Sequence, residues 1–313
     1  MIRFWGGAAV LLAILGKPLV AEELKPRWEF GVSYVAGTAT EYVFQPSAER
    51  YYNNPVSRLT WAIPPSLAAT FTVEMPWLPW TASNFRLQVA QPVVTGTLID
   101  EDWNAGSYIY ARSEHPTQMT ANLSAQLEQT FHLRVFDVLI GGLYRWMSWE
   151  AWDGSGAYTT SSGTENVSFT GPIIAYHQQW LIPYLGLSTT FRLAGLGWTP
   201  TVRFGPTAIC WDRDDHNYAQ NIINASTGKP SPPLTFLDTV WGGYYFQSSL
   251  DVSLSEGNMD WGLRISGQMT RGAMGDTTTT YPYQGSTPPS YENSSWAAGA
   301  QFEDLSLTVF VRN

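Results

Sequence analysis

The chain has 313 residues and a formal net charge of −9, which disfavours nucleic acid as a partner and favours cationic molecules. Charged residues make up 14% of the sequence, against about a quarter in soluble domains, and 15 Trp and 16 Tyr are present. This composition argues against an ordinary soluble domain. Cys210 is the only cysteine, so an intramolecular disulfide is excluded, and we interpret it as a packing residue.

The first 21 residues have the pattern of an export signal. Arg3 supplies a positive charge, an apolar run follows over residues 4–15, and Ala21 provides the small residue that signal peptidase requires. The run is about 12 residues long, whereas a membrane-spanning helix needs about 20, so a membrane anchor is disfavoured. We therefore expect residues 1–21 to be a signal peptide and residues 22–313 to form the mature protein.

Apolar and polar residues alternate along almost the whole mature chain. Successive side chains of a strand face opposite sides, so this period predicts strands with one face toward lipid and one toward a polar lumen. A closed barrel satisfies its backbone hydrogen bonds within lipid, and Trp and Tyr collect at its two interfaces. Three stretches show the apolar positions clearly: Leu59, Trp61 and Ile63; Leu250, Val252 and Leu254; and Leu305, Leu307, Val309 and Val311.

Long and short connections alternate between the predicted strands. Five long connections and four short ones imply ten antiparallel strands, with both termini on the short-turn side. This is the pattern of a bacterial outer-membrane β-barrel with long extracellular loops and short periplasmic turns. The long connections lie near residues 45–56, 98–117, 151–166, 212–236 and 272–293, and the short ones near 75–83, 132–136, 193–196 and 255–259.

Two acidic clusters lie in the second and fourth long connections and therefore at the same end of the predicted barrel. Asp100 and Asp102 are two residues apart, as are Asp214 and His216, so each pair shares a face in extended backbone. A histidine that acts as a base needs a carboxylate to orient it and a proton to abstract near its other nitrogen. The clusters thus indicate a hydrolase that holds a water between the pairs. A solvated or calcium-binding acidic loop is the alternative, and a zinc site is disfavoured because it needs three or four ligands.

Four segments resemble the omptin family of outer-membrane proteases. Residues 99–103 read Ile-Asp-Glu-Asp-Trp and residues 113–116 read Ser-Glu-His-Pro. Residues 212–218 read Asp-Arg-Asp-Asp-His-Asn-Tyr, and the upstream Gly-Thr-Ala-Thr-Glu of residues 37–41 resembles the end of the family's first strand. Their order matches the family along the mature chain. The resemblance implies an all-β, ten-stranded transmembrane barrel in the bacterial outer membrane.

The resemblance also implies catalytic roles. Asp214 would orient His216 and stabilise its protonated form, and His216 would deprotonate a water molecule. Asp100 would help to position that water, and Asp102 would support the arrangement. Because water is the nucleophile, no covalent intermediate, metal or protein-bound cofactor is implied.

Two further acidic residues match the family's specificity pocket. Glu41 corresponds to the acidic residue at the top of the first strand, and Asp212 to the one two residues before the orienting aspartate. Two converging carboxylates would bind Arg or Lys by charge-assisted hydrogen bonds. We therefore expect an endopeptidase that cleaves basic peptides or proteins after a basic residue, between paired Arg or Lys residues, and that acts as a monomer.

Some positions depart from the family. Omptins require lipopolysaccharide, which they hold with cationic residues on the outer wall, but Trp146 and Ser148 follow Tyr144 where the family has an acidic residue and an arginine. Gln179 replaces a further arginine, so bidentate phosphate contacts are lost. Another lipid, or a truncated lipopolysaccharide, is an alternative activator. The chain also continues beyond Phe310, whereas outer-membrane barrels usually end on an aromatic residue, so its C-terminus is atypical for membrane insertion.

Two rival functions fit parts of the sequence. The first is a non-enzymatic outer-membrane barrel that serves as an adhesin or binds surface proteins through its loops. The second is a lipid hydrolase that uses a serine–histidine pair, for which Ser113 and His115 are the candidates. Cleavage of a basic peptide separates both rivals from the peptidase.

Overall fold

The computed structural model describes residues 25–44, 55–104, 108–160, 163–217, 234–272, 275–281 and 290–313. The predicted signal peptide lies outside these residues. Within them, no helix is long and apolar enough to cross a membrane. They form fifteen β-strands of one sheet. The strands are β1 (Arg27–Phe44), β2 (Pro55–Leu78), β3 (Thr81–Pro92), β4 (Gly96–Asn104), β5 (Tyr108–His132), β6 (Asp137–Thr160), β7 (Gly163–Ser188), β8 (Phe191–Leu193), β9 (Leu196–Gly205), β10 (Ala208–His216), β11 (Leu234–Gly242), β12 (Tyr244–Glu256), β13 (Met259–Arg271), β14 (Gly275–Tyr281) and β15 (Ser290–Arg312).

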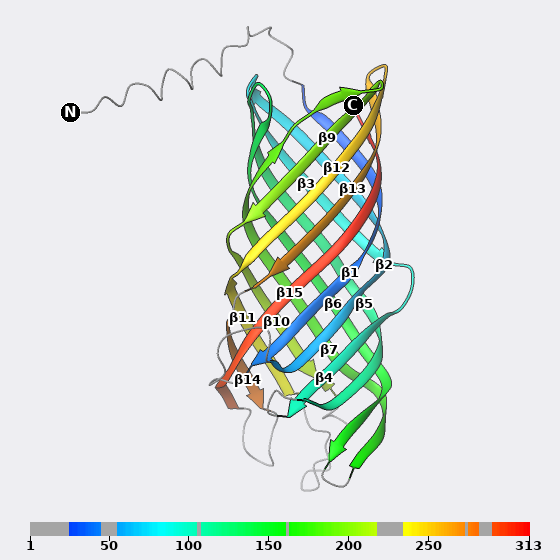
Figure 1. Ribbon diagram of the computed structural model, residues 1–313, viewed down its shortest axis with the longest axis vertical. Coiled ribbons are helices and arrows are strands. Elements are labelled where there is room, and N and C mark those ends of the chain that lie inside the picture. Colours follow the sequence, from blue (N-terminus) through cyan, green and yellow to red (C-terminus); the bar gives the residue numbers. More distant parts are fainter. Residues whose placement is uncertain are drawn as a thin grey trace, which may run out of the picture.

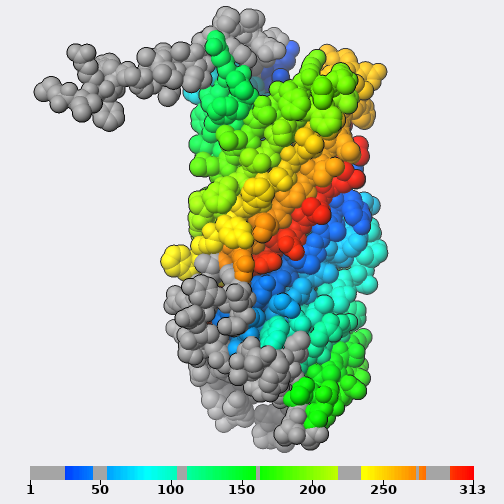
Figure 2. Space-filling view, viewed as in Figure 1, coloured from blue at the N-terminus to red at the C-terminus, as the bar shows by residue number. Residues whose placement is uncertain are grey.

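The sheet closes on itself as an antiparallel barrel, as predicted. β1 pairs with β2 on one side and with β15 on the other, which joins the first strand to the last. Figure 1 shows the resulting barrel of tilted strands, and in Figure 2 the red surface of β15 lies between β13 and the blue surface of β1. Pairing of the first strand with the last closes the ring, as a barrel in lipid requires.

In several places two consecutive strands have the same neighbouring strand and lie one after the other along it. β3 and β4 both pair with β2 and β5, and β13 and β14 both pair with β15. β9 and β10 likewise both pair with β7. Counting each of these three pairs as one strand reduces the fifteen segments to twelve. The predicted number of ten therefore stays a prediction.

The short turns lie at the end of the barrel where the C-terminus is found (Figure 1). They occupy residues 79–80, 133–136, 194–195 and 257–258, close to the predicted positions. In the third turn Ala194 and Gly195 both have positive φ, 52° and 81°, as a two-residue hairpin turn of type I′ requires.

Two of the predicted long loops are instead mostly strand. β4 and β5 continue through most of the segment near 98–117, and β6 and β7 form a hairpin that stays paired up to Thr160 and Gly163. The expectation of loops there was wrong because polar residues form strands readily when both faces of a hairpin meet water. The connections over 45–54, 218–233 and 282–289 lie outside the described residues.

The outer wall carries a belt of exposed apolar side chains, which marks the part that lies in the membrane. Leu305 is 69% exposed on β15, in agreement with the prediction for that strand. We call this surface the apolar belt. It includes Phe30, Val32, Leu263, Ile265, Leu305, Leu307 and Val309.

Beyond the apolar belt the apolar side chains face the interior of the barrel and the polar side chains face outward. Leu59, Trp61 and Ile63 are buried in the interior, at most 3% exposed, while Arg58 and Thr60 alternate with them. The prediction that these three apolar residues face lipid was therefore wrong. This end of the barrel has an apolar interior and a polar exterior, as a soluble barrel has, so it projects out of the membrane. We call it the rim; it comprises β4, the adjoining ends of β1 and β2, and the parts of β10 and β11 nearest His216 and Leu234.

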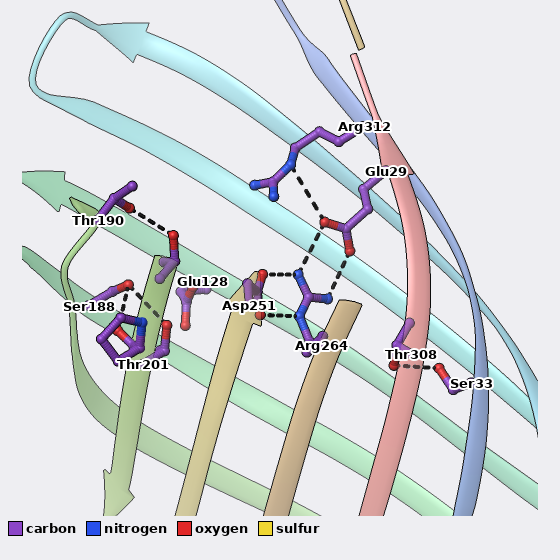
Figure 3. A network of polar contacts seen from close by, with 12 residues as sticks. Glu29, Ser33, Glu128, Ser188, Thr190, Thr201, Asp251, Arg264, Thr308 and Arg312 are labelled. Atoms are coloured by element: carbon purple, nitrogen blue, oxygen red, sulfur yellow. Dashed lines mark hydrogen bonds and ion pairs between the residues drawn. The ribbon is translucent and has the colours of Figure 1, made fainter. Parts of the chain in front are cut away.

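The lumen at the opposite end is filled by paired charges (Figure 3). Arg264 donates through Nη1 to Glu29 Oε1 at 2.8 Å and through Nε to Asp251 Oδ1 at 2.7 Å, and all three residues are buried. Nearby, Arg203 donates through Nε to Glu128 Oε2 at 2.7 Å. These contacts join strands from distant parts of the chain and hold the interior of the barrel together.

Replacing Arg264 with methionine is expected to lower the free energy of unfolding by about 3–5 kcal/mol, because Glu29 and Asp251 would remain buried beside each other. Unfolding by urea in detergent micelles would measure this loss. The matched change Arg27→Met breaks an exposed contact of 3.8 Å to Glu74 at the same end, and it should cost less than about 1 kcal/mol. Equal losses in the two variants would contradict the importance of the buried network.

Candidate active site

The predicted site residues lie on the rim, outside the membrane-spanning segments. On the outer face of β10 the last large apolar side chain is Trp211, which is 42% exposed. Arg213 and Asp215 follow on the same face and pair with each other at 2.8 Å. Asp214 and His216 point the other way, into the mouth of the barrel. The site is thus surrounded by a wall whose outer surface is charged.

Asp214 and His216 contact each other directly. Nε2 of His216 donates to Oδ2 of Asp214 at 2.5 Å, and Asp214 is only 1% exposed. Phe236 of β11 packs edge-on against the imidazole, with ring centroids 5.2 Å apart. The carboxylate and the phenyl ring therefore fix the orientation of the histidine.

Asp100 and Asp102 lie on β4 and alternate with Glu101, which forms an ion pair with Arg58. Burial raises the pKa of Asp100 to about 7; the charge of Asp102 adds to this rise, and His216 opposes it. Burial also raises the pKa of Asp102, while a hydrogen bond with Ser57 and the charge of His216 oppose the rise. The aspartate pair of β4 and the histidine of β10 thus act on each other's charge across the barrel mouth.

The pKa of His216 is raised from its ordinary value of 6.5. Burial acts to lower it, but this effect is outweighed by Asp214, through its charge and its hydrogen bond, and by Asp100 and Asp102. The carboxylates around the imidazole therefore favour its protonated form. An imidazole in this setting can accept a proton and hold it near the aspartates.

A second group of carboxylates lies next to this pair. Carboxylate oxygens of Glu41, Asp212 and Asp238 are within 4.8 Å of one another, and each of the three residues is buried. The structure therefore brings together Glu41 and Asp212, the two predicted pocket residues, and adds Asp238. We call these three residues the acidic trio.

Asp238 was missed because its position beside Asp212 depends on the register between two strands, which the sequence does not show. In the structure β11 begins at Leu234, and Asp238 lies directly opposite Asp212 in the antiparallel register. The sequence feature that could have revealed Asp238 is the alternation of polar and apolar residues within 234–242. It places Asp238 on the same face as Phe236 and Val240, and hence toward the interior.

The walls around the acidic trio are aromatic and tightly packed. The rings of Trp61 and Tyr176 are stacked, with centroids 5.3 Å apart, and Trp149 packs against both. Cys210 is fully buried, and its thiol donates to Oδ2 of Asp212 at 3.8 Å, which agrees with its interpretation as a packing residue. Burial raises the pKa of Glu41 well above its ordinary value, and the neighbouring carboxylates, foremost that of Asp214, raise it further.

Ser113 and His115 also meet, on β5. The hydroxyl of Ser113 lies 2.8 Å from Nε2 of His115, whose Nδ1 donates to the backbone carbonyl of Asp153. Both side chains are buried, and Phe169 packs edge-on against the imidazole at 4.9 Å. These contacts brace the hairpin of β6 and β7 against β5.

The positions at which the family holds lipopolysaccharide lie on β6 and β7. Tyr144 donates to Oε1 of Gln179 at 3.0 Å, and Ser148 accepts a hydrogen bond from Thr120 at 2.8 Å. Trp146 is 38% exposed. Ser148 and Gln179 thus supply a hydroxyl and an amide where the family has arginines, and Trp146 supplies an indole where it has an acidic residue.

The fold and the site together define a class of protein: a closed membrane barrel that carries acid–histidine chemistry on its projecting end. Residues 27–312 match the Omptin family, and the chain belongs to this family. It is therefore a bacterial outer-membrane protease.

A solved protease structure agrees on the fold. The outer membrane protease OmpT from Escherichia coli superposes with a TM-score of 0.73 at 16% identity, over 91% of this chain and 95% of that chain. The translocator domain of autotransporter NalP from Neisseria meningitidis reaches a TM-score of 0.36 at 10% identity, over 97% and 93% of the two chains. No curated protein sequence matches the chain.

Proposed function

We propose that this protein is an endopeptidase that cleaves basic peptides or proteins after a basic residue, between paired Arg or Lys residues. Its active site would face the extracellular side of the outer membrane. The observation that carries the proposal is the juxtaposition of the Asp214–His216 pair with a group of buried carboxylates. A base and a cation-binding pocket side by side are what cleavage next to a basic residue requires.

The proposed reaction uses water as the nucleophile. His216 takes a proton from the water as it attacks the scissile carbonyl, and Asp214 stabilises the imidazolium that forms. The imidazolium then returns a proton to the departing amine, so no covalent intermediate arises. Asp100 helps to position the water, and Asp102 supports Asp100. No metal or protein-bound cofactor takes part in this scheme.

The proposed specificity comes from the pocket that holds Glu41 and Asp212. A guanidinium or ammonium group that enters it would exchange water for charge-assisted hydrogen bonds in a site of low dielectric constant. The stacked rings of Trp61 and Tyr176 supply an aromatic wall, and aromatic faces attract cations. The negative net charge of the chain would further concentrate cationic substrates near the mouth.

We further propose that the barrel acts as a monomer in contact with outer-membrane lipid. Lipopolysaccharide would bind less tightly than the family pattern implies, because Trp146, Ser148 and Gln179 offer no guanidinium for its phosphates. A truncated lipopolysaccharide or another lipid would then serve as the activator.

The rate of cleavage is expected to rise as pH increases through about 7. His216 must be neutral to act as a base and Asp100 must be ionised, and the pKa of each group is raised from its ordinary value. Both groups are therefore protonated, and the enzyme inactive, at low pH. The change Asp102→Asn removes a charge that raises both pKa values, so it should shift the midpoint of the pH–rate profile to lower pH. An unchanged midpoint would contradict this coupling.

The proposed function is tested by incubating the refolded mature barrel with a quenched fluorescent peptide that contains one Arg-Arg pair. We expect cleavage, and we expect lipopolysaccharide to stimulate it less than a family member with the full set of phosphate-binding arginines. Absence of cleavage by a folded barrel, with or without lipid, would instead favour a surface-binding protein. Release of fatty acid from phospholipid would favour a lipid hydrolase.

A further inference from the structure

We propose that the acidic trio, Glu41, Asp212 and Asp238, is a binding site for Ca²⁺, and that the bound ion occupies the pocket meant for the basic side chain of the substrate. Metal binding itself is independent of the proposed function; only the competition with substrate rests on it. The trio was assembled by the fold from three strands, β1, β10 and β11.

The positions of the oxygen atoms fit a calcium ion. Ca²⁺ holds its oxygen ligands at about 2.3–2.6 Å, so two ligands of one ion lie up to about 5 Å apart. The carboxylate oxygens of the trio are spread over at most 4.8 Å. Mg²⁺, with ligands at about 2.0–2.1 Å, demands a near-ideal octahedron and keeps several waters, whereas Ca²⁺ accepts irregular sets of oxygen ligands. Three carboxylates on three different strands suit the less demanding ion.

Unpartnered oxygens supply the second observation. Oε2 of Glu41 and Oδ1 of Asp212 have no hydrogen-bond partner among the described residues, although both residues are at most 5% exposed. Asp238 is 3% exposed, and Thr277 is the one hydroxyl that acts on its carboxylate among the described residues. Buried acceptors are almost always satisfied in folded proteins, so unsatisfied carboxylate oxygens gathered in one place indicate a missing ligand.

The charges around the trio indicate a dication. The charged groups that act most strongly on Glu41 are all carboxylates: Asp214, Asp212, Asp238 and Asp100. Asp212 and Asp238 face each other across neighbouring strands, and like charges in such positions destabilise a sheet. One monovalent side chain would leave two of the three carboxylates uncompensated, whereas one divalent ion leaves a single one.

The chemistry of the donors selects the kind of metal. All three ligands are carboxylates, and hard cations such as Ca²⁺ prefer oxygen, whereas zinc sites use mainly nitrogen and sulfur. The nearby thiol of Cys210 already donates to Asp212, so it is protonated and not a metal ligand in this arrangement. The trio lies on strands rather than on loops, which keeps the ligands in place without the ion.

A competitive effect on catalysis follows. Ca²⁺ in the pocket would exclude an arginine or lysine side chain, since both need the carboxylates of Glu41 and Asp212. Calcium should therefore raise the KM for an Arg-Arg peptide and leave kcat unchanged. The site would make the peptidase sensitive to extracellular calcium.

Luminescence of Tb³⁺, which replaces Ca²⁺ at oxygen sites, tests the proposal without any peptide. Tyr176 lies beside Asp212, so excitation of aromatic residues should sensitise an ion bound in the trio. The folded wild-type barrel in detergent should bind one Tb³⁺ that Ca²⁺ displaces. Asp238→Asn, which keeps the shape of the side chain, should weaken binding at least about tenfold, because affinity depends on the number of charged ligands.

The matched control is Asp276→Asn on β14, a strand that pairs with β11. Asp276 is an exposed carboxylate. It lies opposite Thr239, and Thr239 is the residue that follows Asp238 in the chain. Its replacement should leave Tb³⁺ binding unchanged. Equal binding by wild type and the Asp238 variant, or no displacement of Tb³⁺ by millimolar Ca²⁺, would overturn the proposal. Because binding is read without substrate, these results stay distinct from a failure to find peptidase activity.

Discussion

Replacing His216 with alanine is expected to lower kcat/KM for an Arg-Arg peptide by about 10³- to 10⁴-fold. The imidazole is the only group of the proposed mechanism that both accepts the proton of the water and returns it to the departing amine. Asp214→Asn should have a loss of similar size, since an amide neither stabilises the imidazolium nor holds the ring in the same tautomer. Initial rates at several substrate concentrations would give the values.

Asp215→Asn is the matched control for this pair. Asp215 lies between Asp214 and His216 in the chain, but it points outward and accepts hydrogen bonds from Arg213 and Thr235. Its replacement should leave kcat/KM within a few-fold of wild type. If the His216 variant retained more than a tenth of the activity, or if Asp215→Asn were as harmful, the assignment of the base would be wrong.

Replacing Asp212 with asparagine is expected to lower kcat/KM for the same peptide by about 100-fold, equal to roughly 2.7 kcal/mol of lost transition-state binding. The variant loses a buried carboxylate that would pair with the guanidinium group of the substrate. Glu41→Gln should act in the same direction. Both variants should discriminate less between peptides with arginine and peptides with an uncharged residue before the scissile bond.

Glu303→Gln controls for a general loss of negative charge. Glu303 lies on β15, is exposed on the outer wall, and accepts a hydrogen bond from Thr38. It should change neither kcat/KM nor the preference for arginine. If Asp212→Asn reduced cleavage of charged and uncharged peptides equally, the carboxylate would have a structural role and not one in specificity.

The geometry of the candidate site was the part of this molecule most open to prediction from sequence. The spacing of two residues between Asp214 and His216 places both side chains on one face of any extended strand, whatever the surrounding fold. The same rule applies to Asp100 and Asp102. Local backbone periodicity alone was sufficient for these pairs, and their electrostatic influence on each other required only that both connections lie at one end.

Features that depend on the length of the barrel could not be predicted in this way. Alternation shows that Leu59, Trp61 and Ile63 share a face, but it does not show whether that face meets lipid or the interior. The answer depends on how far the strands project beyond the membrane, and hence on pairing between distant segments. Asp238 was missed for a related reason, since its position opposite Asp212 is set by the register of β10 and β11.

The most direct test of the central claim is to identify the bond that the folded barrel cleaves. One peptide with a single Arg-Arg pair and a single Glu-Glu pair, separated by neutral residues, would be incubated with the wild type and with the His216→Ala variant. Mass spectrometry of the products should show cleavage between the two arginines by the wild type alone. Cleavage at the glutamate pair, or equal cleavage by the His216 variant, would contradict the account.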